Sequence, residues 1–313
     1  MKIAFVMDPI AGVDIDADTT FAMMFAAKER GHQVYFIDMN DMSARGDRAF
    51  TYAQTCDVRR VQGDHYTLGE REHLPLDTFD CVFMRKDPPF DIPYLHACHL
   101  LELAEERGTL VMNKPNGLRA ANEKLYALHF VDAIPDTLVT KSAAEVRAFA
   151  EERGGSCIIK PLDGHGGHGV MLLSLEDRNA HAILEVMMHN ETEYLMCQQY
   201  LPSARTGDKR IIMLDGEPLG GILRVPQESD HRGNIHVGGS VVKSDLTPRD
   251  LEICAAVGPR LKADGLWFVG LDVIGDYLTE VNVTSPTGIQ ELGRLNGFDA
   301  SGQVIEWIEQ RIA

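Results

Sequence analysis

The sequence predicts an α/β protein built from more than one domain. A strand–helix–strand order opens the chain, a glycine-rich segment lies between two β-type runs in the middle, and two further β-type runs carry acidic residues near the end. At 313 residues the chain is also longer than one ordinary hydrophobic core supports. We therefore expect an open α/β unit followed by smaller mixed units.

Composition excludes several classes of partner. The chain has 47 acidic and 30 basic residues, a net charge of -17, which argues against binding to nucleic acid. Its six cysteines show no CxxC spacing, as in reduced proteins of the cytoplasm. No apolar run has the length of a membrane span, and the opening run is too short for a signal peptide. We expect a soluble, cytoplasmic protein without a membrane or nucleic-acid partner.

The first 120 residues have the pattern of a small open α/β domain. Ligands of such domains meet the carboxyl ends of the strands, and Arg85 follows one strand directly. A surface ion pair with Asp87 is the alternative for Arg85, but the neighbouring Pro88-Pro89 favours a positioned anion contact. The expected strands are 2–7, 33–38, 80–84 and 110–112, and the expected helices are 18–30 and 94–107.

The central glycine-rich segment predicts a hairpin. Gly164, Gly166 and Gly169 match G-x-G-x-x-G, but a dinucleotide fold needs a helix after the loop, and Val170–Leu175 is a β-type run instead. A glycine-rich hairpin can cover phosphates with its backbone N–H groups, as in protein kinases. Lys160, inside the strand before the loop, is a candidate phosphate contact; an edge lysine with a solvated head is the alternative.

Later segments supply further cations and a predicted lid. Arg210 and Arg224 flank one hairpin. The segment 226–240 is long, polar and rich in glycine, so we expect a mobile lid, with Arg232 as the cation that reaches bound phosphate or carboxylate. Helices are expected at 142–153, 179–189, 247–264 and 298–311.

The C-terminal hairpin predicts a magnesium site. Two β-type runs, 268–274 and 277–283, are joined through Gly275-Asp276. Glu280 and Asn282 are two residues apart, so they share one face of a strand. Asp272 shares this face only if the loop has an odd number of residues or the hairpin contains a bulge. A regular two-residue turn would pair Asp272 with Thr279 instead. Hard oxygen ligands of this kind suit Mg²⁺. The alternative for each acid alone is a solvated strand edge.

Together these motifs resemble the ATP-grasp superfamily, and within it the bacterial type of glutathione synthetase. The resemblance runs from VMDPI at 6–10 and MRKDPPFD at 84–91, through NKP, NEKL, IIKPLDGxGG and GDKR, to FVGLDVIGDxLTEVNVTSPTG. It implies an ATP-grasp fold, α/β with an α+β part that binds ATP. The implied domains are an N-terminal substrate domain at 1–121, a central lid domain at 122–201 and a catalytic domain with the metal site at 202–313.

The resemblance also implies roles for individual residues, with Arg210 and Lys160 catalytic. The implied ATP contacts are Lys124, Lys160, Gly164, His165, Gly166, Gly167, Gln198, Gln199, Tyr200, Leu201 and Asp208. The implied dipeptide contacts are Arg85, Arg210, Arg224, Arg232, Asn282, Ser285 and Thr287, and the implied ligands of Mg²⁺ or Mn²⁺ are Asp272, Glu280 and Asn282. The chain departs from the family at His165, commonly Met, and at Ser240, commonly Arg.

The implied reaction is ATP-dependent ligation of γ-L-glutamyl-L-cysteine and glycine through an acyl phosphate, by a homo-oligomer that is a tetramer in the family. A related carboxylate–amine ligase, such as a D-alanine–D-alanine ligase or an amino-acid ligase, is the alternative within the same class. A nucleotide-binding regulatory protein without turnover is a third possibility. The joint presence of Lys160, Arg210, Glu280 and Asn282 argues against it.

Overall fold

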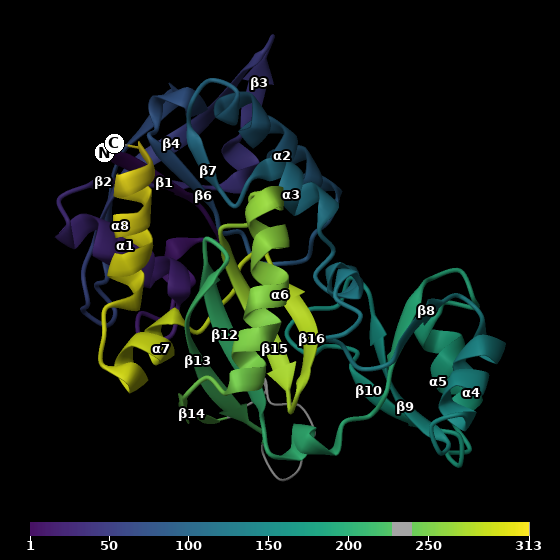
Figure 1. Ribbon diagram of the computed structural model, residues 1–313. Helices are drawn as coiled ribbons and strands as arrows, with labels where there is room; N and C mark the ends of the chain where they lie inside the picture. The colour runs from purple at the N-terminus through teal and green to yellow at the C-terminus, as the bar shows by residue number, and fades with distance from the viewer. Residues whose placement is uncertain (227–239, 313) are drawn as a thin grey trace.

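The structure is a computed structural model that describes residues 1–226 and 240–312, which contain three β-sheets (Figure 1). The first sheet has the strand order β3-β4-β2-β1-β6-β7, with β5 beside β4. Its strands are β1 (Lys2–Val6), β2 (Gln33–Ile37), β3 (Ser43–Arg45), β4 (Arg48–Val58), β5 (Tyr66–Pro75), β6 (Cys81–Met84) and β7 (Leu110–Met112). Strand β1 pairs in parallel with β2 and β6, as the predicted strand–helix–strand order requires.

Helices accompany the parallel part of this sheet. They are α1 (Thr19–Glu29), α2 (Ile92–Glu105) and α3 (Pro115–Ala120). Asp18 and Asp91 cap α1 and α2, because their carboxylates accept hydrogen bonds from the backbone N–H groups of Phe21 and Tyr94. The sequence patterns did not predict β3, β4 and β5, which form an antiparallel extension of the sheet.

The central sheet is antiparallel, in the order β10-β9-β11-β8. Its elements are β8 (Thr137–Thr140), α4 (Ala143–Glu151), β9 (Ser156–Pro161), β10 (Met171–Ser174), α5 (Ala180–Met187) and β11 (Leu195–Gln198). Strands β9 and β10 pair with Met171 opposite Ile159, so the prediction of a glycine-tipped hairpin is confirmed. Helices α4 and α5 lie together on one side of the sheet and enclose a core of their own with it (Figure 1).

The third sheet is antiparallel, in the order β14-β13-β12-β15-β16. Its strands are β12 (Asp208–Leu214), β13 (Glu217–Val225), β14 (Ser240–Ser244), β15 (Phe268–Ile274) and β16 (Tyr277–Asn282), and the helices are α6 (Pro248–Asp264), α7 (Ile289–Asn296) and α8 (Ala300–Ile312). Helix α6 begins at the predicted residue because Thr247 and Asp250 form a capping box. It ends at Gly265, whose φ of 70° suits glycine.

The first and third sheets share their hydrophobic cores. One buried cluster contains Val82 and Leu101 together with Leu271 and Val281, and a second joins Phe21 to Val304. The terminal helix α8 runs beside α1 (Figure 1), where Glu309 is hydrogen-bonded to Arg30 and His32. The central sheet stands apart from both (Figure 1). The domain limits at 121 and 201 remain a prediction.

No helix in the described ranges 1–226 and 240–312 is long and apolar enough to cross a membrane.

The side chain of Asn113 connects the end of the first sheet to the third sheet by hydrogen bonds. Its Nδ2 donates to the carbonyls of Phe268 (2.8 Å) and Val283 (2.8 Å), and its Oδ1 accepts from the Phe268 N–H (2.7 Å). All three bonds are buried. The side chain thereby positions both strands of the acidic hairpin relative to the first sheet.

We expect Asn113→Ala to lower the free energy of unfolding by about 2–4 kcal/mol, because buried backbone groups at Phe268 and Val283 lose their partners. Urea unfolding midpoints of the variant and the wild type measure this. The exposed Asn116 in α3 provides the control; Asn116→Ala should shift the midpoint much less, and equal shifts would contradict the anchoring role of Asn113.

Candidate active site

The register of the β15–β16 hairpin brings the predicted metal residues together. Asp272 lies opposite Glu280, and Asn282 lies opposite Gly270. The register shifts after Asp272, because Val273 pairs with Leu278 and Thr279 is the additional residue. The predicted bulge is therefore present, and the regular two-residue pairing of Asp272 with Thr279 is not. Asp272, Glu280 and Asn282 consequently share one face of the hairpin.

Two arginines hold the carboxylate of Asp272. Arg210 binds it through two bonds, Nε to Oδ1 at 2.5 Å and Nη2 to Oδ2 at 3.0 Å. Arg224 Nη2 lies 3.0 Å from Oδ1, and the amide nitrogen of Asn282 donates to Oδ2 at 3.2 Å. Arg224 Nη2 also lies 2.6 and 2.5 Å from the two oxygens of Asp208. Asp208, Arg210, Arg224 and Asp272 thus form a buried cluster of alternating charge, the arginine–aspartate cluster.

The two acids of this cluster differ in their pKa values. Burial acts to raise the pKa of Asp272, but Arg210 and then Arg224 outweigh it, so this pKa lies below its ordinary value. Burial prevails at Asp208 and raises the pKa of its carboxyl despite Arg224. Asp272 is therefore the more readily ionised of the two, because two arginines neutralise its charge.

Two lysines face the hairpin from the side of the central sheet. Lys160 Nζ donates to Gln198 Oε1 at 2.6 Å. Lys124 Nζ donates to the carbonyl of Gly164 and lies 3.2 Å from Glu280 Oε1. Burial lowers the pKa of Lys160, against the opposing effect of Glu280. Lys160 is half-buried, its amine is bound to Gln198, and its strand β9 lies between β10 and β11, so the interpretation as an edge lysine is wrong.

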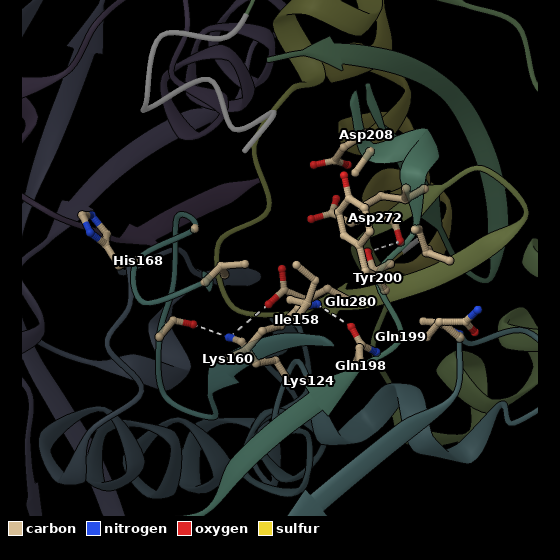
Figure 2. Close-up of a pocket in the computed structure, with 18 of the residues that line it drawn as sticks. Lys124, Ile158, Lys160, His168, Gln198, Gln199, Tyr200, Asp208, Asp272 and Glu280 are labelled. Carbon is tan, nitrogen blue, oxygen red and sulfur yellow. Dashed lines mark hydrogen bonds and ion pairs between the residues drawn. The ribbon is translucent and has the colours of Figure 1, made fainter. Parts of the chain in front are cut away.

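A pocket lies between the central sheet and the β15–β16 hairpin (Figure 2). It contains about 940 Å³ of space, with open solvent at its mouth included. In Figure 2 the acids Asp208, Asp272 and Glu280 follow one another along one side, whereas His168 lies apart. The lining residues are Lys124, Pro135, Ile158, Lys160, Gly164, His165, Gly167, His168, Val170, Gln198, Gln199, Tyr200, Leu201, Ala204, Asp208, Asp272, Ile274, Thr279 and Glu280.

Nearly all predicted ATP contacts line this pocket. Gly166 does not, although it belongs to the same turn. Gly166, Gly167 and Gly169 have φ angles of 60°, 80° and 73°, a backbone region that favours glycine, so the loop shape depends on these residues. The central sheet thus supplies Lys160 and a glycine turn, the connection that precedes it supplies Lys124, and the third sheet supplies carboxylates.

Those predicted dipeptide residues that the structure describes lie together beyond Asp272. Arg210 Nη1 donates to the carbonyl of Thr287 at 3.1 Å. Arg85, only 3% exposed, donates from Nε to Thr20 Oγ1 (3.1 Å) and from Nη2 to the carbonyl of Pro286 (2.9 Å). Ser285 Oγ donates to the carbonyl of Arg85 at 3.4 Å. The alternative of a surface ion pair between Arg85 and Asp87 is therefore wrong.

Arg232 and the predicted lid at 226–240, apart from its two end residues, lie outside the described residues.

The shared face of the hairpin fits a hard divalent cation. Asp272 and Glu280 offer carboxylate oxygens, and Asn282, whose amide nitrogen faces Asp272, retains its amide oxygen. No group of three His, Cys, Asp or Glu side chains in the described parts of the chain has the arrangement of a metal site. Two carboxylates and one amide oxygen fit Mg²⁺, which binds few protein ligands and completes its shell with water and phosphate.

Sequence reasoning missed the residues that hold this site in place. Asn113, Asn122 and Glu123 fall in a polar connection, and their side chains accept from or donate to backbone groups far along the chain. No spacing rule connects them with those partners. The available signals were their polarity next to predicted strands and their place in the NKP and NEKL motifs.

Solved structures with the same fold are ATP-grasp ligases. D-cycloserine synthetase DcsG superposes with a TM-score of 0.70 at 16% identity, over 100% of both chains. The ATP-grasp ligase PsnB, in a complex with a minimal precursor, Mg and ADP, superposes with a TM-score of 0.63 at 20% identity, over 99% of this chain and 97% of PsnB. At these identities the likeness shows the fold, which is that of the ATP-grasp class.

Sequence comparison then gives the family. Residues 1–119 match the model of the prokaryotic glutathione synthetase N-terminal domain, and residues 123–297 match that of the prokaryotic glutathione synthetase ATP-grasp domain. The glutathione synthetase of Synechococcus elongatus is 47% identical over 99% of this chain and 98% of its own length. That of Brucella melitensis is 45% identical over 99% of both. The chain belongs to the prokaryotic glutathione synthetase family.

The lowered pKa of Asp272 predicts a pH-dependent contribution to stability. A carboxyl with a depressed pKa in the folded state stabilises the fold above its unfolded pKa of about 3.9 and loses this effect as the pH falls further. Asp272→Asn should therefore lower the urea midpoint clearly at pH 7, and the difference from wild type should shrink below about pH 4.

The exposed Asp276, in the turn of the same hairpin, provides the control. Asp276→Asn should change the midpoint little at either pH. A difference between Asp272→Asn and wild type that is the same at pH 7 and pH 3.5 would exclude the ion pairs as its source.

Proposed function

We propose that this protein catalyses the ATP-dependent ligation of γ-L-glutamyl-L-cysteine and glycine to glutathione, with release of ADP and phosphate. The observation that carries the proposal is the pocket between the glycine-tipped hairpin and the acidic hairpin, in a chain whose whole length matches glutathione synthetases. Lysines on one wall and carboxylates on the other suit phosphoryl transfer, which depends on positioning and charge neutralisation.

ATP occupies this pocket in the proposed complex. Ile158, Leu201 and Ile274 form apolar surface in it, and the connector 198–201 after β11 borders the adenine. Lys124, Lys160 and the turn 164–167 then hold the phosphates, where amines and backbone N–H groups are concentrated. Because Lys160 is half-buried, its contact with phosphate is stronger than that of a fully exposed lysine.

The dipeptide occupies the region of Arg85, Arg210, Arg224, Asn282, Ser285 and Thr287. Its cysteinyl carboxylate attacks the γ-phosphorus of ATP, forming an acyl phosphate and ADP. The glycine amine then attacks the acyl carbon, a proton leaves the nitrogen, and inorganic phosphate departs. Arg210, fixed by Asp272 and by the carbonyl of Thr287, stabilises negative charge that develops on the transferred group.

Asp272, Glu280 and Asn282 are the residues that would hold Mg²⁺, or Mn²⁺ in its place. When bound, the ion neutralises phosphate charge. Basic side chains fix the positions of the two carboxylates that would hold the ion. Arg210 positions Asp272, and Lys124 positions Glu280.

Ligation of D-alanine or of other amino acids is not favoured, because the full-length relatives named above are glutathione synthetases. We also propose that the protein is located in the cytoplasm and assembles into a homo-oligomer, a tetramer as in the family. It also includes domain limits at 1–121, 122–201 and 202–313. The separate core of the central sheet supports these limits.

The activity is tested by ADP release with γ-glutamylcysteine plus glycine, compared with D-alanine and with no acceptor. ADP should form fastest with the dipeptide and glycine together. With ¹⁸O in the cysteinyl carboxylate, the label should appear in the released phosphate, because an acyl phosphate transfers one carboxylate oxygen. Faster release with D-alanine would contradict the substrate assignment, and unlabelled phosphate would contradict the acyl-phosphate route.

Glu280→Gln should lower turnover by about 10²–10³, the typical cost of losing one charge contact in the transition state. Its urea midpoint should stay close to that of wild type, because the volume of the side chain is preserved. Turnover is measured across a range of Mg²⁺ concentrations. Wild-type rates at low Mg²⁺ would exclude Glu280 as a metal ligand.

A further inference from the structure

The connection Asn122–Lys124 lies between the first sheet and the central sheet and contacts the glycine-rich turn. Asn122 Nδ2 donates to the carbonyl of Leu162 at 3.0 Å, and Lys124 Nζ donates to the carbonyl of Gly164. Asn122 Oδ1 also accepts from the Lys124 N–H at 3.1 Å, which fixes the backbone from which the lysine extends. One side of this connection therefore positions the phosphate-binding part of the pocket.

Glu123, the residue between them, binds the end of strand β16. Its Oε1 accepts three hydrogen bonds, from the N–H of Val283 (2.9 Å), the N–H of Thr284 (3.0 Å) and Thr284 Oγ1 (2.8 Å). The backbone carbonyl of Glu123 accepts a further bond from the Val281 N–H at 3.0 Å. A single carboxylate oxygen thus accepts all three hydrogen bonds from the two residues that directly follow β16.

The segment held by Glu123 joins the metal residues to the dipeptide residues. Val283 and Thr284 directly follow Asn282 and precede the segment 285–287, whose carbonyls bind Arg85 and Arg210. Glu123 does not line the pocket. It is not among the residues assigned to ATP or to the dipeptide, yet it connects the backbone that carries Lys124 with the backbone that carries the dipeptide contacts.

We propose that Glu123 is a positioning residue for phosphoryl transfer, which sets the segment 283–287 and Lys124 in one fixed relation. The proposal rests on the proposed function, since the two sides are the ATP side and the dipeptide side of that reaction. The requirement is geometric: an acceptor oxygen must lie where Oε1 lies. Glutamine supplies such an oxygen, whereas aspartate carries the charge on a side chain one methylene shorter and does not reach.

Kinetics of Glu123→Ala, Glu123→Gln and Glu123→Asp test this requirement. With γ-glutamylcysteine and glycine, Glu123→Ala and Glu123→Asp should lose about 10² in kcat, the order expected from a misplacement of about 1 Å. Glu123→Gln should stay within a few-fold of wild type. The exposed Glu70 on β5 provides the control, and Glu70→Ala should match wild type. A wild-type kcat in Glu123→Ala would overturn the proposal. So would a near-wild-type kcat in Glu123→Asp together with a large loss in Glu123→Gln.

Hydrogen exchange of the free protein separates this proposal from the assignment of substrates. The Val283 and Thr284 amides should exchange faster in Glu123→Ala and at the wild-type rate in Glu123→Gln, whichever substrates the enzyme uses. Unchanged exchange in Glu123→Ala would overturn the proposal even if the dipeptide is the substrate. If Glu123→Ala does not fold, Thr284→Val, which removes the hydroxyl bond alone, should still lower kcat several-fold, and an unchanged kcat would overturn the proposal.

Discussion

The ion pairs between Asp272 and its two arginines are the constraint on which the rest of the site depends. Arg210 and Arg224 come from neighbouring strands, and Asp272 comes from the strand on the other side of Arg210. Removing such charges from water is costly unless each one is paired. The pairing therefore limits how β12, β13 and β15 can be aligned. The bulge that follows Asp272 then determines which residue of β16 faces it.

Local patterns were sufficient to predict most elements that carry chemistry. The glycine-tipped hairpin followed from a β-type run after Gly169, and the start of α6 followed from Thr247 and Pro248. The face shared by Glu280 and Asn282 followed from strand periodicity. Each of these signals lies within a few residues of the feature that it predicts, which is why the sequence alone reveals it.

Other features depend on contacts between distant residues, and no local pattern encodes them. Two outcomes, a regular turn and a bulge, were consistent with the sequence of the acidic hairpin, and the structure has the bulge. The residues that anchor the site, Asn113 and Glu123, bind backbone groups 155 to 170 positions away. Strands β3 and β5 were missed because most of their residues are exposed. Strand β4 alternates buried and exposed residues, but its buried face consists mostly of small residues and gives a weak apolar signal.

The separate core of the central sheet has a consequence for ligand entry. Lys160 and the glycine-rich turn belong to the central sheet and its hairpin, whereas Asp208, Asp272 and Glu280 belong to the body formed by the other two sheets. The chain crosses between these bodies twice, near Asp136 and near Gln199, and the two crossings are hydrogen-bonded to each other at 2.9 Å. No described residue belongs to the buried cores of both bodies. A widening of the gap that admits a nucleotide would therefore leave both cores intact and would break the polar contacts from Asn122 and Lys124 to the glycine-rich turn.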